Sequence, residues 1–125
     1  MGSWEGRFKK EIAELYPEEW NLWVNQPEKL KVKGMESLAE VQKRAKSGLD
    51  RLVLQHRGEI LVVVSHRAVL KPLIAACLNI SPPYFWKIHL DTASYSLLSY
   101  KENRGYCLLQ LNQTKHLREY TAEWV

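Results

Sequence analysis

The chain has 125 residues, a length that fits one domain with a core of its own. Hydrophobic residues make up 46% and charged residues 26%, the balance of an ordinary globular protein, and no apolar run is long enough to cross a bilayer. The formal net charge of +4 comes from basic residues interleaved with acidic ones. We therefore expect neither a nucleic-acid partner nor a membrane partner, whereas a pocket for an anionic small molecule is compatible with this charge.

The N-terminus and the cysteines predict a cytoplasmic protein. The first 15 residues contain no apolar signal-peptide core. Cys77 and Cys107 both lie within apolar segments, so we expect reduced thiols in the core and not a disulfide framework.

Three helices are predicted in the first half of the chain. Apolar residues at helical spacing indicate a short amphipathic helix over residues 7–16. Pro17, followed by two glutamates that suit the positive end of a helix dipole, predicts a second short helix directly behind it. Ser37 and Glu40 form an S-x-x-E capping box at the start of a long helix, and Gly58 can supply the left-handed residue beyond its end.

An unbroken apolar run, Ile60 to Val64, predicts a strand over residues 59–65. Such a run is typical of a strand that is covered on both faces inside a parallel sheet. A helix should follow at once, from about Arg67 to Leu78.

Two further apolar segments, "YSLLSY" and "YCLLQL", predict a hairpin whose strands are joined by "KENRG". The whole order is helix, helix, long helix, strand, helix, strand, strand, which predicts an α/β sandwich with a mixed sheet. Only three strands are predicted, although a strand that is buried on both faces needs a neighbouring strand at each edge. The chain therefore reads as though part of its sheet were missing.

His66 stands where the predicted strand ends and the next helix begins. Ligand sites of α/β sheets lie at the carboxyl ends of strands, and helix N-termini attract phosphate. Arg67 adds donors that match a phosphate group, and Lys71 falls on the same helical face one turn later. Together these groups indicate a phosphoryl site. If only the tetrapeptide "VSHR" is considered, a structural histidine that bonds to a backbone group at the strand end is a better interpretation than a phosphoryl site.

Two other chemistries are disfavoured. Ser65 and His66 are adjacent, so on a strand their side chains point to opposite faces and cannot form a nucleophile–base pair. No metal site is expected, because no metal-ligand spacing is found among the two cysteines and the four histidines, His56, His66, His89 and His116.

The order of several segments resembles the histidine phosphatase superfamily, which has the phosphoglycerate mutase-like fold. The resemblance covers residues 2 to about 117 and favours the branch of α-ribazole phosphatases and broad-specificity phosphatases. It rests on the segments "GSWEG", "EIAELYPEEWNLW", "GMESLAEVQKR", "EILVVVSHRAVLKPLIAACL", "FWKIHLDTASYSLLSY" and "LNQTKHL".

The resemblance implies a phosphomonoester hydrolase or mutase that works without a metal or other cofactor. In the family, a histidine of an "RHG" motif attacks phosphorus, and a second histidine, matched by His66, stabilises the transferring group. Arg67 and the loop Thr92–Ala93 would bind the phosphate of a phosphorylated small molecule. Arg67 replaces the family's usual glycine, which would change the charge and shape of the pocket.

The chain departs from the family at its N-terminus. It contains no "RHG", and the family's acid carboxylate would fall before Met1. We therefore expect residues 1–125 to be a single, N-terminally truncated domain with a phosphoglycerate mutase-like three-layer sandwich that lacks the family's first strand. The isolated chain should be inactive or weakly active. Either the chain is the C-terminal part of such an enzyme, with the strand supplied by upstream sequence or by a companion chain, or it is a non-catalytic, phosphate-binding or oligomerising remnant, for instance a homodimer.

Overall fold

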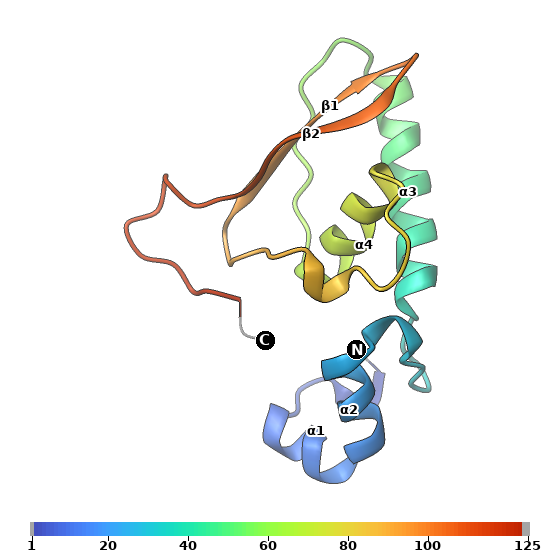
Figure 1. Ribbon diagram of the computed structural model, residues 1–125, viewed down its shortest axis with the longest axis vertical. Helices are drawn as coiled ribbons and strands as arrows, with labels where there is room; N and C mark the ends of the chain where they lie inside the picture. The colour runs from blue at the N-terminus through green and yellow to red at the C-terminus, as the bar shows by residue number, and fades with distance from the viewer. Residues whose placement is uncertain (1, 124–125) are drawn as a thin grey trace.

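The structure is a computed structural model, and it describes residues 2–123. Within that range it contains four α-helices, a hairpin of two strands and three short 3₁₀ turns (Figure 1). The helices are α1 (Lys9–Leu15), α2 (Pro17–Asn25), α3 (Leu38–Gln55) and α4 (Arg67–Cys77), the strands are β1 (Tyr95–Lys101) and β2 (Gly105–Gln113), and the turns are Gly2–Trp4, Pro27–Lys29 and Phe85–Lys87. The predicted α/β class is confirmed.

Helices α1 and α2 form a unit at one end of the molecule (Figure 1). As predicted, Pro17 occupies the first turn of α2. Trp4, Ile12 and Leu30 make the small buried core of this unit, and the ring of Trp20 lies 6.3 Å from that of Trp4. The two short predicted helices are therefore confirmed, with α1 slightly shorter than expected.

The capping box fixes the start of α3. Glu40 donates its backbone N–H to Ser37 Oγ at 3.3 Å, and Ser37 donates its own N–H to Glu40 Oε2 at 2.7 Å. The helix packs on α4, and Gln42 donates to the carbonyl of Pro72 at 2.9 Å. Leu52, near the C-terminal end of α3, lies outside the core and is 40% exposed.

The main core lies between α4 and the segment that follows it. Ile74 and Ala75 of α4 are buried together with Tyr84, Phe85 and Leu90. Glu28 joins this core to the N-terminal unit, because its carboxylate accepts the backbone N–H groups of Tyr84 and Phe85 at 2.7 and 2.8 Å. The backbone around residue 85 is thereby held at the base of α4.

The hairpin agrees with the prediction. Strands β1 and β2 are antiparallel, with Tyr100 opposite Tyr106 and Lys101 opposite Gly105. Gly105 has φ +76°, the left-handed conformation that glycine adopts at little cost in a tight connection.

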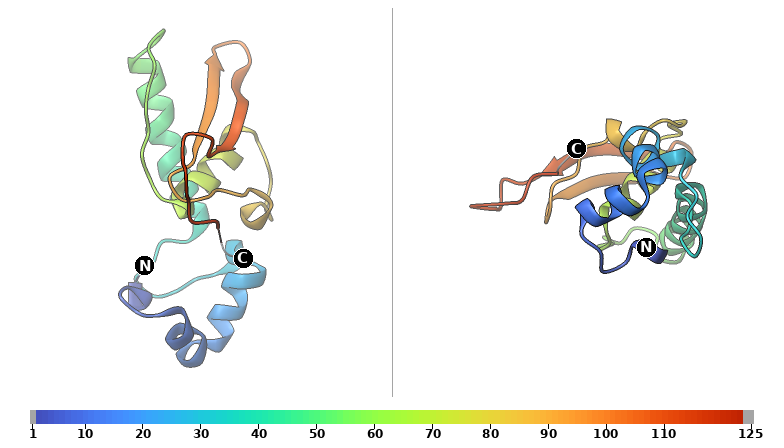
Figure 2. Two further views of the ribbon diagram at one scale, coloured as in Figure 1. Left: turned by 90° about the vertical axis from the view of Figure 1, so that its left-hand side faces the viewer. Right: turned by 90° about the horizontal axis from the view of Figure 1, so that it is seen from below.

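The predicted strand over residues 59–65 is wrong for the structure in hand. Among residues 2–123, sheet pairing joins only β1 and β2, so the described sheet is antiparallel and not mixed. Residues 59–65 pass instead as an unpaired segment from the end of α3 back to α4 (Figures 1 and 2). Ile60, Val62 and Val64 are 95%, 85% and 90% exposed, because no neighbouring strand covers them.

The two cysteines differ in their surroundings. Both are unpaired thiols, but Cys77 is buried in α4 whereas Cys107 is exposed on β2. The expectation of two core cysteines was therefore wrong for Cys107. None of the helices within residues 2–123 is long and apolar enough to cross a membrane.

Candidate functional site

A large open cavity, with a volume of about 1620 Å³, extends between the unpaired segment 59–65 and β1. Of the residues singled out from the sequence, four contribute to its lining, His66, Arg67, Thr92 and Ala93, whereas Lys71 does not. Its apolar lining includes the exposed side chains of Val62 and Val64 together with the ring of Phe85.

His66 is the residue at which the extended segment turns into α4. Its backbone is extended, with φ −102° and ψ 157°, and its carbonyl accepts the N–H groups of Val69 and Leu70 at 2.9 and 2.8 Å. The imidazole is exposed. The N–H groups of Arg67 and Ala68 precede these first bonds of α4, so they and His66 can offer donors to the same region of the cavity.

The loop that carries Thr92 and Ala93 is held by the C-terminal tail. Thr92 donates its N–H to the carbonyl of Thr121 at 3.1 Å. The ring Nε2 of His116 lies 3.0 Å from the carbonyl oxygen of Ala93. Ala93 has φ +57°, a strained conformation for a residue with a Cβ atom, which shows that the contacts around the loop fix its backbone.

Lys71 lies in the interior, one turn beyond Arg67. The residue is fully buried, and its ammonium lies 4.6 Å from the ring centre of Phe85 and 4.8 Å from that of Trp86. Burial lowers the pKa of Lys71, and the carboxylate of Glu123 partly opposes this change. The structure therefore places Lys71 beneath the cavity surface and not on the surface beside Arg67.

Glu123 is a charged residue of this region that sequence reasoning missed. Its side chain is only 3% exposed, and its carboxylate forms ion pairs with Lys71 and, at 3.6 Å, with Nη1 of Arg67. It also accepts the backbone N–H of Leu90 at 2.9 Å. Nothing in the local sequence around "TAEWV" indicates burial, because each of these partners lies far away along the chain.

Asp91 connects the tail to the hairpin. It accepts the backbone N–H of Glu123 at 2.8 Å and the side-chain amide of Asn112 at 2.8 Å. His89 Nε2 lies 2.8 Å from the same carboxylate, and His89 Nδ1 lies 3.5 Å from Glu123. The pKa of Asp91 is held below its usual range, mainly by the hydrogen bond from Asn112.

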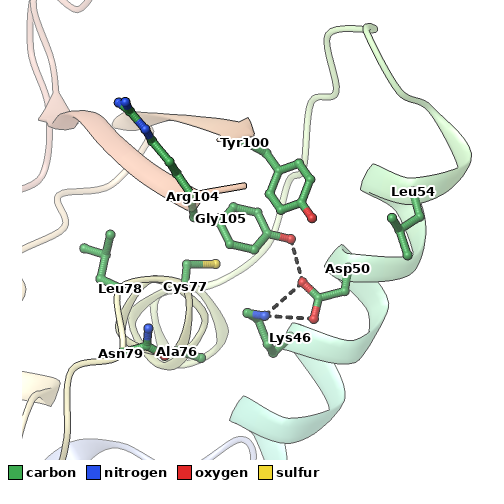
Figure 3. A pocket seen from close by; sticks show the side chains of 11 residues that line it. Lys46, Asp50, Leu54, Ala76, Cys77, Leu78, Asn79, Tyr100, Arg104 and Gly105 are labelled. Atoms are coloured by element: carbon green, nitrogen blue, oxygen red, sulfur yellow. Dashed lines mark hydrogen bonds and ion pairs between the residues drawn. The ribbon is translucent and has the colours of Figure 1, made fainter. Parts of the chain in front are cut away.

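A second pocket, with a volume of about 490 Å³, lies between α3, α4 and the hairpin (Figure 3). Lys46 donates to both oxygens of Asp50 at 2.9 and 2.8 Å, and the hydroxyl of Tyr106 donates to Asp50 at 2.6 Å. The polar groups are thus paired with one another and tie β2 to α3. We interpret the cluster as structural.

Neither pocket contains a cluster that resembles a metal site. Across the described part of the chain, no group of three or more histidine, cysteine or acidic side chains could hold a metal ion.

The sequence and the fold both match known phosphatases. The model of the histidine phosphatase superfamily (branch 1) matches residues 1–114. Phosphoserine phosphatase 1 of Hydrogenobacter thermophilus is 38% identical over 122 residues, which are 98% of this chain and 57% of that protein. The 2-carboxy-D-arabinitol-1-phosphatase of Triticum aestivum is 30% identical over 117 residues, covering 90% of this chain and 23% of the plant protein.

Two solved structures share the fold. YhfR of Bacillus stearothermophilus superimposes with a TM-score of 0.80 and 25% identity, over 93% of this chain and 57% of that one. A mutant phosphoserine phosphatase of Entamoeba histolytica, in complex with phosphoserine, gives a TM-score of 0.75 and 24% identity over 93% and 58% of the two chains. The present chain thus spans somewhat more than half of the length of these bacterial and amoebal proteins.

Proposed function

The chain belongs to the histidine phosphatase superfamily, and from this premise we propose that it forms the phosphate-stabilising part of a phosphomonoester hydrolase or mutase. The observation that carries the proposal is the convergence of four groups on one cavity: His66, Arg67, the start of α4 and the loop Thr92–Ala93. Donors that are fixed before the reaction stabilise the charge of a transferring phosphoryl group, and this is the main task of a protein in phosphoryl transfer.

Each group has a specific role in this proposal. His66 stabilises the equatorial oxygens of the phosphoryl group, as the resemblance implies for the histidine at this position. Arg67 and the N-terminus of α4 neutralise the phosphate charge. The backbone of Thr92–Ala93 borders the phosphate on the opposite side. The substrate is a phosphorylated small molecule, in line with the names of the phosphatases that resemble the chain.

The nucleophilic histidine, in this proposal, comes from a strand outside residues 1–125. The exposed segment 59–65 supports this placement, because a strand laid along it would satisfy its backbone groups and cover Val62 and Val64. That strand would end near His66. It would come from sequence upstream of these residues or from a companion chain, and residues 1–125 are then a single domain without the first strand of the family.

We propose that the protein is cytoplasmic. The two unpaired thiols of the described chain agree with this, because cysteines stay reduced in the cytoplasm.

Hydrolysis of p-nitrophenyl phosphate by the pure chain tests the proposed division of roles. We expect turnover at least about 100-fold below that of the Hydrogenobacter relative, since an absent acid alone typically costs ~10²–10⁴-fold. A rate similar to that of the relative, abolished by His66→Ala, would show that a residue of this chain attacks phosphorus.

A second candidate function, non-catalytic assembly, is favoured by one observation. The exposed apolar segment 59–65 is an open edge of the kind that pairs with another chain, including a second copy. Phosphate binding separates the two functions, because a purely oligomerising protein has no need of an anion site at His66.

A further inference from the structure

The carboxylate of Glu123 occupies an anion-binding position that other parts of the fold have built. Its cationic partners, Arg67 and Lys71, belong to α4, and its amide donor is the N–H of Leu90. Lys71 is fully buried, and its ammonium lies against the rings of Phe85 and Trp86, which do not belong to the tail. A buried ammonium is costly without a counter-charge, so this position requires an anion.

The tail that delivers Glu123 is anchored mainly at its last described residues. Its anchoring hydrogen bonds include those from Thr92 N–H to Thr121 O and from Glu123 N–H to Asp91. The residues before Glu123, from Arg118 to Ala122, are exposed. Opening of this exposed segment therefore costs mainly the contacts of Glu123, and a ligand carboxylate that takes over its ion pairs lowers that cost.

We propose that Arg67, Lys71 and the N–H of Leu90 form a carboxylate subsite, which the side chain of Glu123 fills until the carboxylate of a ligand displaces it. This inference rests on the proposed function, because Arg67 then lies between the phosphate position at His66 and the carboxylate position at Lys71. The ligand class that follows is a small phosphate monoester that also carries a carboxylate. The tail acts as an intramolecular competitor for such ligands.

Two probes of closely matched structure test the subsite by calorimetric titration of the full chain. O-phosphoserine carries a carboxylate, and phosphoethanolamine is the same molecule without it. In Glu123→Gln we expect the affinity for phosphoserine to rise at least tenfold, while that for phosphoethanolamine changes less than twofold. Glu119→Gln, a change at an exposed glutamate of the same tail, should alter neither affinity.

Trypsin cleavage of the unmodified chain gives a second readout. Phosphoserine should accelerate cleavage after Lys115 and Arg118 of the tail at least threefold, because it displaces Glu123. Cleavage after Arg104, in the hairpin connection, should be unchanged. This measurement decides the question even where Glu123→Gln does not fold.

The outcomes separate the subsite from the proposed function. Equal gains for both probes, or phosphoserine binding with no gain in Glu123→Gln and no faster tail cleavage, would overturn the carboxylate subsite alone. Failure of both probes to bind any variant would overturn the phosphate site at His66, and the subsite with it.

Discussion

The ammonium of Lys71 in α4 is paired with the carboxylate of Glu123 in the C-terminal tail, and both side chains are almost fully excluded from water. Breaking such a pair on one side leaves a buried charge without a partner, which is more costly than removing both charges. The pair therefore couples the position of the tail to the core around Phe85 and Trp86.

Lys71→Met should lower the free energy of unfolding by about 3 kcal/mol, because the carboxylate of Glu123 loses its buried partner. The double variant Lys71→Met with Glu123→Gln should recover most of this loss. Urea unfolding followed by tryptophan fluorescence measures both. A single variant within about 0.5 kcal/mol of the unmodified chain, the usual range of surface changes, would mean that the pair contributes nothing to stability.

Asp91 should make the chain more stable at neutral pH than in acid. Its pKa in the folded chain is held below the usual range, first by the hydrogen bond from Asn112. The unfolded chain therefore binds the proton more readily, and the stabilisation is present above the unfolded pKa and is lost as pH falls through the folded pKa.

Asp91→Asn should accordingly lose less stability than the unmodified chain between pH 7 and pH 3, as measured by urea midpoints. Glu14→Gln, a change at an exposed side chain of α1, is the control. Identical acid sensitivity of Asp91→Asn and the unmodified chain would contradict the role given to Asn112.

The two thiols should react at very different rates. Burial raises the pKa of Cys77 to about 11, whereas Cys107 is exposed on β2. Because the thiolate is the reactive form, iodoacetamide at pH 8 should modify Cys107 well before Cys77. Mass spectrometry of the peptides after timed quenching measures the order, and Cys107→Ser gives the rate of Cys77 alone. Faster labelling of Cys77 would show that α4 is not packed as described.

Local patterns predicted the elements whose stabilising groups lie close together in the sequence. The capping box of Ser37 and Glu40 fixed the start of α3, and Pro17 marked that of α2, because these signals act within one helical turn. The apolar run over residues 59–65 predicted a strand, but a strand exists only through a neighbour, which the described chain does not supply.

The candidate site was predictable only in part. His66 and Arg67 stand at a local junction of an extended segment and a helix, so the sequence pointed to them directly. The burial of Lys71 and the insertion of Glu123 depend on contacts with α4, Phe85 and Leu90 that join distant parts of the chain. A tail with charged residues and no apolar periodicity carries no signal of such contacts.

Val62→Lys should prevent association while leaving the fold of the chain intact. Val62 is 85% exposed in the single chain, so a lysine there costs little until another strand covers it. Sedimentation velocity across a concentration series should show association of the unmodified chain and a monomer for the variant. Lys31→Ala, a change at an exposed loop residue, is the control. A compact, cooperatively unfolding monomer at high concentration in the unmodified chain would contradict the open-edge interpretation.

The central claim is that His66 and Arg67 form an anion site at the start of α4, and titration of the full chain with inorganic phosphate tests it most directly. We predict millimolar binding that is weakened at least fivefold by His66→Ala and abolished when Arg67→Ala is added. His56→Ala, a change at an exposed histidine at the end of α3, should bind as the unmodified chain does. Absence of phosphate binding, or binding that survives the double change, would contradict the claim.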